Sequence, residues 1–474
     1  MRKQRTELRG RTVAVLGAGV EGVSSAKWLL RQGAVVTMCD RRSRKTLAPV
    51  IKELDRLPRA VRPDGSKAPV AWRFGTTHAD RLGGFDVVLR TQSRRYLGPH
   101  IQRALKDGVR VTSMTKLFFE RNPARRTIGV TGTKGKGTTS SLIAKMLRAA
   151  GKRVWLGGNI GQSPLDFLHR IRPADIVVLE LSSTQLQDLR CSPDVAVVTN
   201  VTADHLDYHR SVREYRSAKR PITRYQRRSD VAILNADDPG SRPFAKDPAR
   251  VRWFSTRKPA GGSPKPDALL EDGWLVVRGK RLLRESELKV PGEHNRQNVL
   301  AAALAASEFG TAPSAAAKAA KAYRGLPYHL EFLGTKRGVR YFNDSYATSE
   351  TAAIPAVASI DTPLVLIVGG RGKGLRSDAL AAAVAKQDVR GIVAIPPEGT
   401  AIVRSIRRAY RRADKPLPKI VIVRRKERIV PAARELARRG DTVLLSPAAT
   451  SFGWFENYTE RGRFFTEQVK RIRP

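Results

Sequence analysis

The sequence predicts a three-domain α/β protein, with Rossmann-like first and third domains and a central domain of the P-loop type. Short apolar runs rich in β-branched residues alternate with helical stretches along the chain, which is typical of mostly parallel sheets covered by helices. Two glycine-rich turns each stand between such a run and a helix. The length of 474 residues corresponds to about three domains of ordinary size.

The first glycine-rich turn lies near the N-terminus. An expected strand, Thr12–Leu16, leads into GAGVEG (17–22), a helical stretch follows, and a second expected strand, Val35–Cys39, ends at Asp40. Asp40 stands 18 positions after the last glycine, as in dinucleotide-binding units. Glycines let the backbone approach a phosphate, and the helix N-terminus offers N–H donors. The turn predicts a nucleotide site without indicating which nucleotide binds; a tight turn without a ligand is the alternative.

The second glycine-rich turn has the form of a P-loop. The sequence GTKGKGTT (132–139) stands between an apolar strand and an amphipathic helix. Its backbone N–H groups can surround phosphates, and Lys136 can reach the β- and γ-phosphate oxygens. The standard P-loop has Ser or Thr directly after the lysine, whereas here Gly137 intervenes. Either Thr138 or Thr139 must therefore supply the hydroxyl for Mg²⁺.

Two further polar side chains follow expected strands of the same domain. Glu180 ends the strand Ile176–Leu179, and His205 follows the strand Val195–Val198. A carboxylate at the carboxyl end of a parallel strand faces the crevice where ligands bind, and Mg²⁺ prefers oxygen ligands. Glu180 is therefore predicted as a magnesium ligand, with a helix cap as the alternative. His205 is predicted in the site because Glu180 and the P-loop lie on the same edge, with a structural histidine as the alternative.

The remaining elements are expected from apolar runs and turn residues. A loop is expected at Arg257–Ala268, a hairpin turn at Arg278–Lys280 and a helix at Asn298–Phe309. The third domain should hold a mostly parallel sheet. Its expected strands are Val339–Phe342, Leu364–Val368, Gly391–Ile395, Ile420–Val423 and Thr442–Leu445.

The charge is unusual, with 88 Lys and Arg against 43 Asp and Glu and a net charge of +45. Such a protein attracts polyanions, so a basic nucleic-acid-binding NTPase is a rival hypothesis. The basic residues are scattered, however, and Arg404–Arg412 is expected to lie in a helix with Ile402, Ile406 and Ala409 on one face and solvated arginines around the rest. Zinc-finger cysteines, RNP aromatics and a basic leucine-zipper heptad are absent from the sequence. No specific nucleic-acid partner is predicted.

The cysteines and apolar runs bear on the cellular compartment. Two cysteines, Cys39 and Cys191, suit a reducing compartment. The apolar run Val13–Val20 is short and interrupted by Gly17 and Gly19, unlike the core of a signal peptide. No stretch approaches the roughly 18 apolar residues of a membrane helix. We expect a soluble cytoplasmic protein.

Seven motifs, in this order, resemble those of the Mur ligases, ATP-dependent enzymes that join an amino acid to a UDP-muramoyl peptide precursor. They are GTKGKGTT (132–139), VLELSSTQL (178–186), TNVTADHLDYH (199–209), PGEHNRQN (291–298), NDSYATS (343–349), GGRGKG (369–374) and LLSPAATSFGWFENYTERG (444–462). The resemblance covers nearly the whole chain and is greatest to the branch that adds D-glutamate to UDP-N-acetylmuramoyl-L-alanine in peptidoglycan precursor synthesis. It implies a UDP-substrate domain at 1–114, an ATP domain at 115–325 and an amino-acid domain at 326–474.

The resemblance implies roles position by position. Catalysis is implied for Lys136, Glu180, His205 and a carbamylated Lys219, and magnesium binding, at two sites, for Thr138, Glu180, His205 and the Lys219 carbamate. ATP contacts are implied for Gly132, Thr133, Lys134, Gly135, Lys136, Gly137, Thr138, Thr139, Asn295, Asn298, His329 and Asp344. The UDP substrate would contact Gly17, Gly19, Gly22, Asp40, Arg41, Asn159, Ser182 and Gln185. The incoming amino acid would contact Thr348, Lys373, Ser451 and Tyr458.

Several positions depart from the family pattern. His329 stands where an arginine is usual and Tyr346 where a lysine is common, and the loop RTQSRRYLGP (90–99) lacks the Ser-Pro-Gly turn. Gly137 is closer to the folylpolyglutamate synthases, relatives that add glutamate to folate and are the alternative assignment. Their N-terminal region has no UDP-binding glycine unit, so residues 17–40 favour a muramoyl substrate.

The resemblance also implies a mechanism. The substrate carboxylate would attack the γ-phosphorus of ATP, and the amine of the amino acid would displace phosphate from the resulting acyl phosphate. A carbamate at Lys219 needs a neutral, partly desolvated amine; on its own, the basic run RSAKR (216–220) would make Lys219 a surface charge. The implied partners are ATP, Mg²⁺ and the two substrates, and we expect a monomer.

Overall fold

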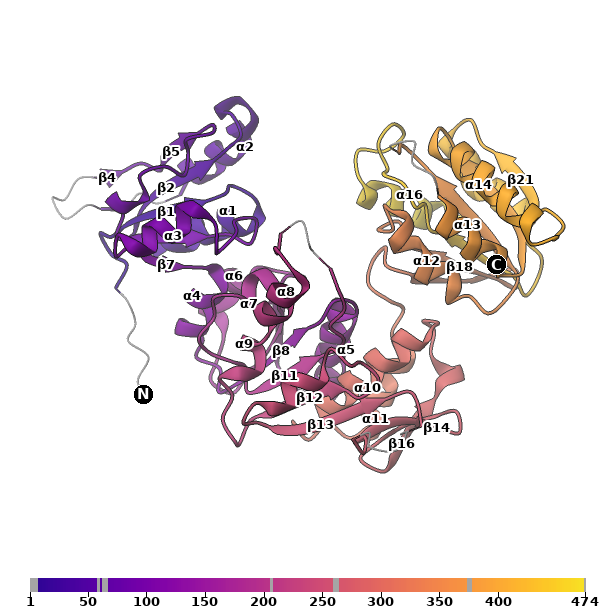
Figure 1. Ribbon diagram of the computed structural model, residues 1–474, viewed down its shortest axis with the longest axis horizontal. Coiled ribbons are helices and arrows are strands. Elements are labelled where there is room, and N and C mark those ends of the chain that lie inside the picture. The colour runs from indigo at the N-terminus through magenta and orange to yellow at the C-terminus, as the bar shows by residue number, and fades with distance from the viewer. Residues whose placement is uncertain are drawn as a thin grey trace. The chain divides into compact units, whose positions relative to one another are not determined.

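The computed structural model describes residues 7–57, 60–61, 67–204, 208–258, 264–372 and 377–472. The chain divides into two compact units, one of Met1–Leu282 with Gln297–Ala317 and one of Leu283–Arg296 with Lys318–Pro474. Three sheets of five to nine strands carry helices on their faces, so the predicted α/β class is confirmed (Figure 1). None of the helices in the described ranges is long and apolar enough to cross a membrane. The domain boundaries implied by the resemblance stay a prediction.

The first sheet has the strand order β5-β2-β1-β6-β7. Its pairings are all parallel, so the carboxyl ends of its strands meet at one edge. The turn GAGVEG follows β1 at the edge where Asp40 ends β2. The strands are β1 (Thr12–Leu16), β2 (Val35–Asp40), β5 (Ala71–Phe74), β6 (Val87–Arg90) and β7 (Arg110–Thr112), beside the pair β3 (Ala60–Val61) and β4 (Lys67–Ala68). The helices are α1 (Val20–Arg31), α2 (Arg44–Asp55) and α3 (Pro99–Lys106), with the 3-10 turn η1 (Leu82–Gly84).

The second sheet has the order β16-β15-β14-β13-β12-β11-β8-β10-β9 and places β8 between β10 and β11. Both pairings of β8 are parallel. The P-loop after β8, Glu180 at the end of β10 and Thr199 after β11 therefore share one edge of the sheet. The strands are β8 (Arg126–Thr131), β9 (Val154–Gly158), β10 (Ile176–Glu180), β11 (Val195–Val198), β12 (Val231–Asn235), β13 (Arg250–Ser255), β14 (Ala268–Glu271), β15 (Trp274–Val277) and β16 (Lys280–Arg284).

Helices of varied length accompany the second sheet. The longer ones are α4 (Met114–Arg121), α5 (Lys136–Ala149), α8 (Val212–Lys219), α10 (Glu293–Ser307) and α11 (Pro313–Ala322). The short ones are α6 (Pro164–Phe167), η2 (Leu168–Arg170), α7 (Ser183–Leu186), α9 (Pro221–Arg224), η3 (Arg242–Lys246) and η4 (Glu285–Glu287). The predicted helix Asn298–Phe309 begins earlier than expected, at Glu293. The apolar pattern starts only at Val299, but Gly292, with φ +96°, is the residue that stops the helix from extending further back.

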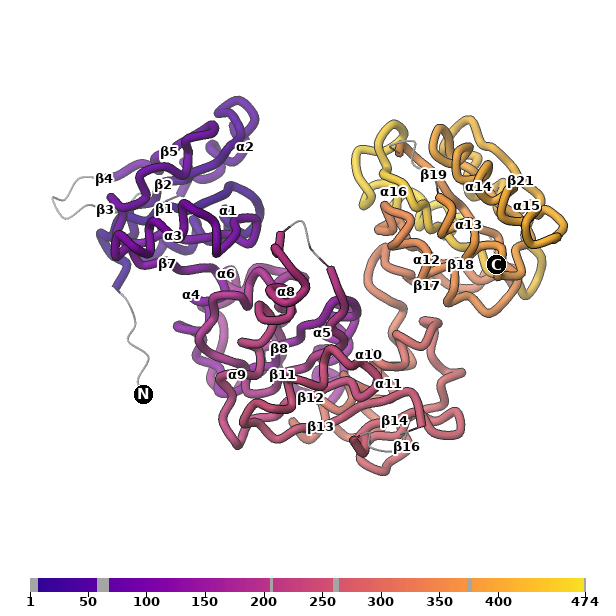
Figure 2. The backbone as a smooth tube through the Cα atoms, in the orientation of Figure 1, coloured from indigo at the N-terminus to yellow at the C-terminus, as the bar shows by residue number. Residues whose placement is uncertain are grey.

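The third sheet has the order β17-β18-β22-β19-β20-β21 and, as predicted, is mostly parallel; among its described strands only β17 and β18 pair antiparallel. Figure 2 traces the backbone and labels β17, β18, β19 and β21 of this sheet. The strands are β17 (Glu331–Lys336), β18 (Val339–Asn343), β19 (Leu364–Gly369), β20 (Val389–Ile395), β21 (Lys419–Ile422) and β22 (Thr442–Leu445). The helices are α12 (Glu350–Ala358), α13 (Asp378–Ala385), α14 (Glu398–Arg412), η5 (Lys426–Arg428), α15 (Ile429–Leu436) and α16 (Tyr458–Lys470).

Both faces of the third sheet are covered. Leu366 and Val368 of β19 belong to one core cluster, whereas Val365 and Ile367 belong to the other. This alternation is the two-residue period of a strand, and burial on both faces explains the continuous apolar run of β19. On α14, Ile402 and Ile406 are buried while the arginines at 404, 407, 411 and 412 are exposed. The predicted solvated arginine face is confirmed.

Candidate active site

The first glycine turn needs two of its glycines for backbone reasons. Gly17 has φ +106°, a conformation that L side chains rarely adopt. A Cβ on Gly22 would lie 1.8 Å from the Gly17 carbonyl oxygen, whereas a Cβ on Gly19 would meet nothing within 4 Å. Protein packing therefore does not require glycine at position 19, and the N-terminus of α1 is open there.

Asp40 is fully engaged within the same turn. One carboxylate oxygen accepts from the Ala18 backbone N–H at 2.7 Å, and the other accepts from the Arg42 backbone N–H at 2.8 Å. The Arg42 guanidinium also donates to both oxygens, each at 3.0 Å. Burial opposes ionisation of Asp40, but these hydrogen bonds outweigh it and hold its pKa well below the usual range. The partner Arg42 was not predicted, while the predicted Arg41 is exposed.

The loop of residues 90–99, which lacks the Ser-Pro-Gly turn of the family, begins at a buried arginine. Arg90, 1% exposed, donates to Asp188 at 2.7 Å and to the Thr184 carbonyl oxygen at 2.9 Å. Lys116 pairs with the other oxygen of Asp188 at 2.9 Å. The end of β6 is thereby tied to the segment that follows α7. Sequence reasoning missed this cluster, for which the only signal was an arginine at the end of an apolar strand.

The P-loop is held by tight contacts around its glycines. Gly132 has φ +154° and Gly135 φ +83°. A Cβ on Gly132 would lie 1.9 Å from the Thr199 hydroxyl, and one on Gly135 would lie 2.3 Å from the Asn298 side chain. Gly135 is the N-cap of α5, whose first-turn N–H groups have no intrahelical partner. These donors and the positive helix end form an anion-binding arrangement.

The two predicted hydroxyl ligands differ in their surroundings. Thr139 is fully buried, and its hydroxyl donates to Asn298 Oδ1 at 3.1 Å. Thr138 is half-buried. Of the two, Thr138 has the accessible side chain, so the structure favours it as the hydroxyl nearest a bound cation.

Two lysine amines meet one carbonyl oxygen of the loop. The Lys136 Nζ donates to the Gly132 carbonyl at 3.1 Å and to the Thr133 carbonyl at 3.0 Å. The Lys219 Nζ, from α8, donates to the same Gly132 carbonyl at 2.9 Å. Burial, and then the charge of Lys136, lower the pKa of Lys219 well below its ordinary value. Lys219 is 1% exposed, so the alternative that it is a surface charge is wrong.

Glu180 faces this pair of amines from the end of β10. It is buried, and its Oε1 accepts from Asn159 Nδ2 at 2.9 Å. Burial also lowers the pKa of Lys136, while the Glu180 carboxylate raises it. The structure thus brings Lys136, Lys219 and Glu180 together, as the sequence predicted.

The predicted substrate residues Ser182 and Gln185 form a helix cap. The Ser182 hydroxyl accepts from the Gln185 backbone N–H, and the Gln185 side chain accepts from the Ser182 N–H, a capping box at α7. The Ser182 hydroxyl also lies 3.4 Å from the side-chain oxygen of Gln92. Their role toward a substrate stays a prediction.

His205 lies outside the described residues, but the neighbouring His209 is described and was not predicted. His209 is fully buried, and its ring nitrogens contact the Ser183 hydroxyl at 2.9 Å and Glu214 at 3.3 Å. It therefore connects α7 to α8, the helix that carries Lys219. Within the described ranges, no group of three or more His, Cys, Asp or Glu residues could hold a metal ion.

In the second unit, Asp344 follows β18 and is buried. It accepts from the Leu330 backbone N–H at 3.1 Å and from the Ser446 hydroxyl at 2.8 Å. Burial raises its pKa to about 7. Asn295, also in this unit, donates to the Pro291 carbonyl oxygen at 2.6 Å.

His329 and Tyr346, two residues that depart from the family pattern, are in contact. Their rings stack with centroids 3.7 Å apart, and Tyr346 meets Tyr458 edge-on at 5.2 Å. Thr348 is exposed beside them. Lys373 lies outside the described residues. The structure therefore groups Tyr458 with the aromatic pair, a grouping that the sequence did not predict.

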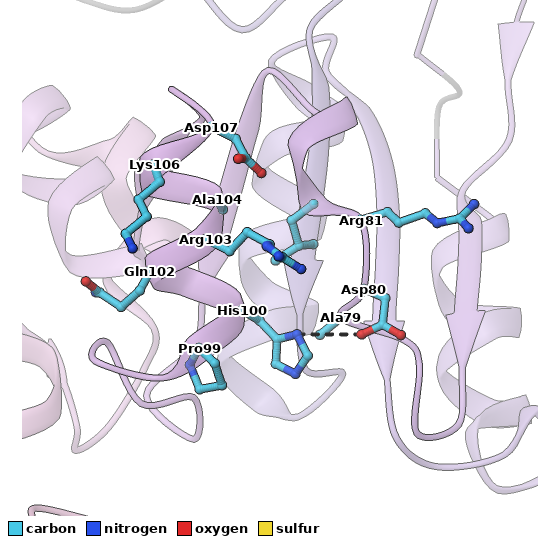
Figure 3. A pocket seen from close by; sticks show the side chains of 11 residues that line it. Ala79, Asp80, Arg81, Pro99, His100, Gln102, Arg103, Ala104, Lys106 and Asp107 are labelled. Carbon is cyan, nitrogen blue, oxygen red and sulfur yellow. Dashed lines mark ion pairs between the residues drawn. The ribbon is translucent and has the colours of Figure 1, made fainter.

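Ser451 lies in a separate pocket of about 300 Å³ at the carboxyl ends of β19 and β20. A larger hollow of about 730 Å³ lies beside α3 in the first unit. Figure 3 shows its side chains, with His100 and Asp80 forming an ion pair and Arg81, Arg103 and Lys106 nearby. Its lining has mixed charge and includes none of the predicted UDP-substrate residues.

Comparison with known proteins identifies the family. Residues 130–306 match the Mur ligase middle domain, and residues 330–449 match the Mur ligase glutamate ligase domain. The UDP-N-acetylmuramoylalanine–D-glutamate ligase of Acetivibrio thermocellus is 35% identical over 474 residues, covering 98% of this chain and 97% of that protein. The chain belongs to the Mur ligase family. A protein of the same name from Symbiobacterium thermophilum is 37% identical over 472 residues, covering 97% and 98%.

Solved Mur ligases share the fold. The UDP-N-acetylmuramate-alanine ligase MurC of Thermotoga maritima superposes with a TM-score of 0.55 at 19% identity, covering 98% of this chain and all of that one. MurF of Acinetobacter baumannii gives a TM-score of 0.57 at 17% identity, covering 83% and 92%. The resemblance, the three-domain fold class and the ligase assignment predicted for this Mur ligase are confirmed.

Proposed function

We propose that this Mur ligase adds D-glutamate to UDP-N-acetylmuramoyl-L-alanine with ATP, through an acyl phosphate, and releases ADP and phosphate. Two near-full-length relatives carry the name of that reaction. The structural observation that supports it most is the meeting of Lys136 and Lys219 at the Gly132 carbonyl beside Glu180. The full-length match favours this substrate over folate.

ATP would bind with its phosphates at the N-terminus of α5. The orphan N–H groups of the first turn and the Lys136 ammonium are donors for phosphate oxygens. A MurF ligase from Thermotoga maritima with the same fold, at a TM-score of 0.54 and 19% identity, was solved in complex with ADP; the match covers 81% of this chain and 95% of that one. Because the proposed ligase reaction consumes ATP, we assign the P-loop, residues 132–139, as its ATP-binding site.

The residues around the P-loop suit magnesium. Glu180 supplies a buried carboxylate, Thr138 an accessible hydroxyl, and His205 and a Lys219 carbamate would complete two sites. Magnesium prefers oxygen ligands such as this carboxylate, the hydroxyl and the carbamate. When bound, it would offset negative charge on the phosphate oxygens.

Lys219 meets the requirement for carbamate formation. A neutral amine forms an N–C bond to CO₂ and loses one proton, which leaves a carboxylate-like group. The shift of the Lys219 pKa far below its ordinary value favours the neutral amine. The adjacent Lys136 charge would then stabilise the anion that forms, in place of the repulsion between two ammonium groups.

The reaction itself depends on positioning and charge. A carboxylate oxygen of the muramoyl substrate attacks the γ-phosphorus, and the bond from that phosphorus to the ADP oxygen breaks. The amine of D-glutamate then attacks the acyl carbon, phosphate leaves, and the nitrogen loses a proton to give the amide. The positive charge of Lys136 would offset the negative charge on the phosphoryl oxygens in both steps.

A phosphate-release assay tests the proposal. Release should require UDP-N-acetylmuramoyl-L-alanine and D-glutamate together, and L-glutamate, other amino acids and folate substrates should not replace them. Release without the UDP substrate would refute the proposed function.

We further propose that the enzyme acts as a monomer in the cytoplasm, and size-exclusion chromatography with light scattering would test the oligomeric state.

A further inference from the structure

His209 connects the two segments that supply Glu180 and Lys219. Its imidazole is fully buried. On one side, Nε2 lies 2.9 Å from the hydroxyl of Ser183, the first residue of α7, which follows closely after Glu180. On the other side, Nδ1 lies 3.3 Å from Oε1 of Glu214, in the first turn of α8. One side chain thus reaches from the carboxyl end of β10 to the helix that carries Lys219.

The chemistry of the two partners fixes the direction of both hydrogen bonds. Burial opposes ionisation of Glu214, but hydrogen bonds from the Arg210 backbone N–H and from His209 outweigh it and lower the pKa of Glu214. An ionised carboxylate only accepts, so Nδ1 carries the proton and donates it to Glu214. Nε2 is then available to accept from the Ser183 hydroxyl. Together these bonds fix the orientation of the imidazole ring.

The order Ser183, His209, Glu214 is that of a hydrolytic triad, but the array is closed to substrates. A triad acts through a serine hydroxyl that attacks a bound substrate. Ser183 is only 2% exposed and His209 is 0% exposed. The array therefore holds α7 and α8 together instead of activating a nucleophile.

The same ring also packs on the face of α8 that holds Lys219. His209 meets Tyr215 edge-on, with ring centroids 5.4 Å apart. The Lys219 Nζ lies 4.7 Å from the centroid of the Tyr215 ring, and the Tyr215 hydroxyl lies 3.0 Å from the hydroxyl of Thr133 in the P-loop. Residues four apart lie on one face of a helix, so a shift of Tyr215 also shifts Lys219. Loss of the His209 ring would therefore displace the Lys219 amine from the Gly132 carbonyl.

We propose that His209 is a positioning residue, which fixes α8 against α7 and thereby sets the place of the Lys219 amine relative to Glu180 and the P-loop. The inference rests on the proposed function and deepens it by a residue that acts through Lys219. A misplacement of about 1 Å at a reacting group costs on the order of 100-fold in rate. A buried polar array with both of its hydrogen bonds made keeps such a distance constant.

Kinetics of the full-length enzyme test this role. His209→Ala should lower kcat by about 10- to 100-fold, with smaller changes in KM for ATP and for the UDP substrate, because the displaced group acts in the chemical step. His209→Asn and His209→Gln, which each keep one of the two hydrogen bonds, should give intermediate values. The matched control is Gln226→Ala, because Gln226 is a buried side chain that bonds to the Pro193 and Val231 carbonyl oxygens. This control should lose stability and keep its kcat.

A double substitution separates positioning of Lys219 from structural support. In Lys219→Ala enzyme supplied with acetate, the further change His209→Ala should alter the restored rate by no more than about 2-fold, because the group that His209 positions is gone. If His209→Ala does not fold, His209→Asn takes its place in this comparison. A restored rate that falls by the same factor as the wild-type rate would overturn the proposal, and so would a wild-type kcat for His209→Ala.

A measurement without turnover separates this inference from the proposed function. With isotope-labelled bicarbonate, carbon NMR should show a weaker carbamate signal in folded His209→Ala than in the wild type, because the displaced amine loses the adjacent charge of Lys136. Gln226→Ala should keep the wild-type signal. Equal signals from wild type and His209→Ala would overturn the proposal. Failure of the wild-type enzyme to release phosphate with D-glutamate would instead refute the proposed function, and the carbamate signal would still report on His209.

Discussion

Lys219 shows how burial changes the chemistry of a single residue. In α8 the Ser211 hydroxyl caps the helix, and the side chains of Tyr215, Ala218 and Lys219 are buried. The amine cannot reach solvent and lies beside the Lys136 charge, so the neutral form is favoured. A buried neutral amine beside a P-loop is a costly arrangement for structure alone, which supports a chemical role.

Lys219→Ala should lower kcat by about 100-fold or more, as expected when a group that offsets charge in the transition state is removed. Acetate should partly restore activity by entering the vacated space and offering carboxylate oxygens. Lys219→Arg should not be rescued, because the guanidinium fills that space and forms no carbamate. Steady-state phosphate release with and without acetate measures the effect, with Lys145→Ala, at an exposed position of α5, as the control. Near-wild-type turnover of Lys219→Ala at saturating ATP and Mg²⁺ would remove the carbamate from the mechanism.

Asp344 should make stability depend on pH. Its pKa is about 7 in the folded protein against an ordinary value of 3.8, so the folded state binds the proton more tightly. The stabilisation is fully present below the unfolded pKa and is lost as the pH rises through 7. Between pH 5 and 8, wild-type protein should lose up to about 3 kcal/mol of unfolding free energy through this group. Asp344→Asn should abolish that part of the pH dependence in urea unfolding, whereas Asp361→Asn, at an exposed carboxylate, should keep it. Parallel pH profiles for wild type and Asp344→Asn would contradict this assignment.

At the scale of elements, the two glycine turns use their glycines differently. In the P-loop, Gly132 and Gly135 are fixed by positive φ and by contacts that a Cβ would violate. In the first turn Gly17 is fixed by its positive φ and Gly22 by its close contact with the Gly17 carbonyl oxygen, whereas a Cβ on Gly19 would meet nothing within 4 Å. Glycine at position 19 is therefore better explained by the approach of a ligand than by packing.

Gly19→Asp should fold, because its Cβ meets no protein atom within 4 Å. A carboxylate there would face the pyrophosphate of the UDP substrate. Like charges in contact cost several kcal/mol, so KM for that substrate should rise about 10-fold or more, while KM for ATP should change little. Gly84→Asp, a change in η1 that also meets nothing within 4 Å, is the matched control. A folded Gly19→Asp variant with an unchanged KM for the UDP substrate would count against the assignment of this turn.

The sequence predicted elements well where the signal is local. The strands β1, β11 and β22 have the predicted bounds, because apolar runs buried on both faces are visible in the sequence alone. The cluster of Lys136, Glu180 and Lys219 was predicted from motifs. The hydrogen-bond partners of Arg90 and His209 were not predicted. Arg90, for example, contacts Asp188, which lies 98 residues away in the sequence. Pairing at such a distance depends on tertiary packing and leaves no local pattern.

At the scale of the whole molecule, the net charge of +45 is spread over many separate sites. The cations are not gathered in one motif. Some are buried and paired, as Arg90 is with Asp188, and others are exposed on a helix face, as on α14. Charge of this kind increases encounter rates with any polyanion, including a nucleotide substrate. It does not distinguish a ligase from a nucleic-acid-dependent NTPase, but dependence on substrates does.

The last prediction separates the two. A protein this basic should bind DNA or heparin at low salt, because each phosphate that is neutralised releases counterions. The affinity should therefore fall steeply with added salt, with no preference for sequence, as fluorescence anisotropy of a labelled duplex would measure. Phosphate release should not be stimulated by DNA or RNA at any salt concentration, since in the proposed mechanism it depends on the two substrates of the ligase reaction. Stimulation of ATP hydrolysis by DNA or RNA in the absence of the UDP substrate and D-glutamate would contradict the ligase mechanism. Binding to DNA that persists at high salt without stimulating hydrolysis would instead indicate a specific nucleic-acid site separate from the P-loop.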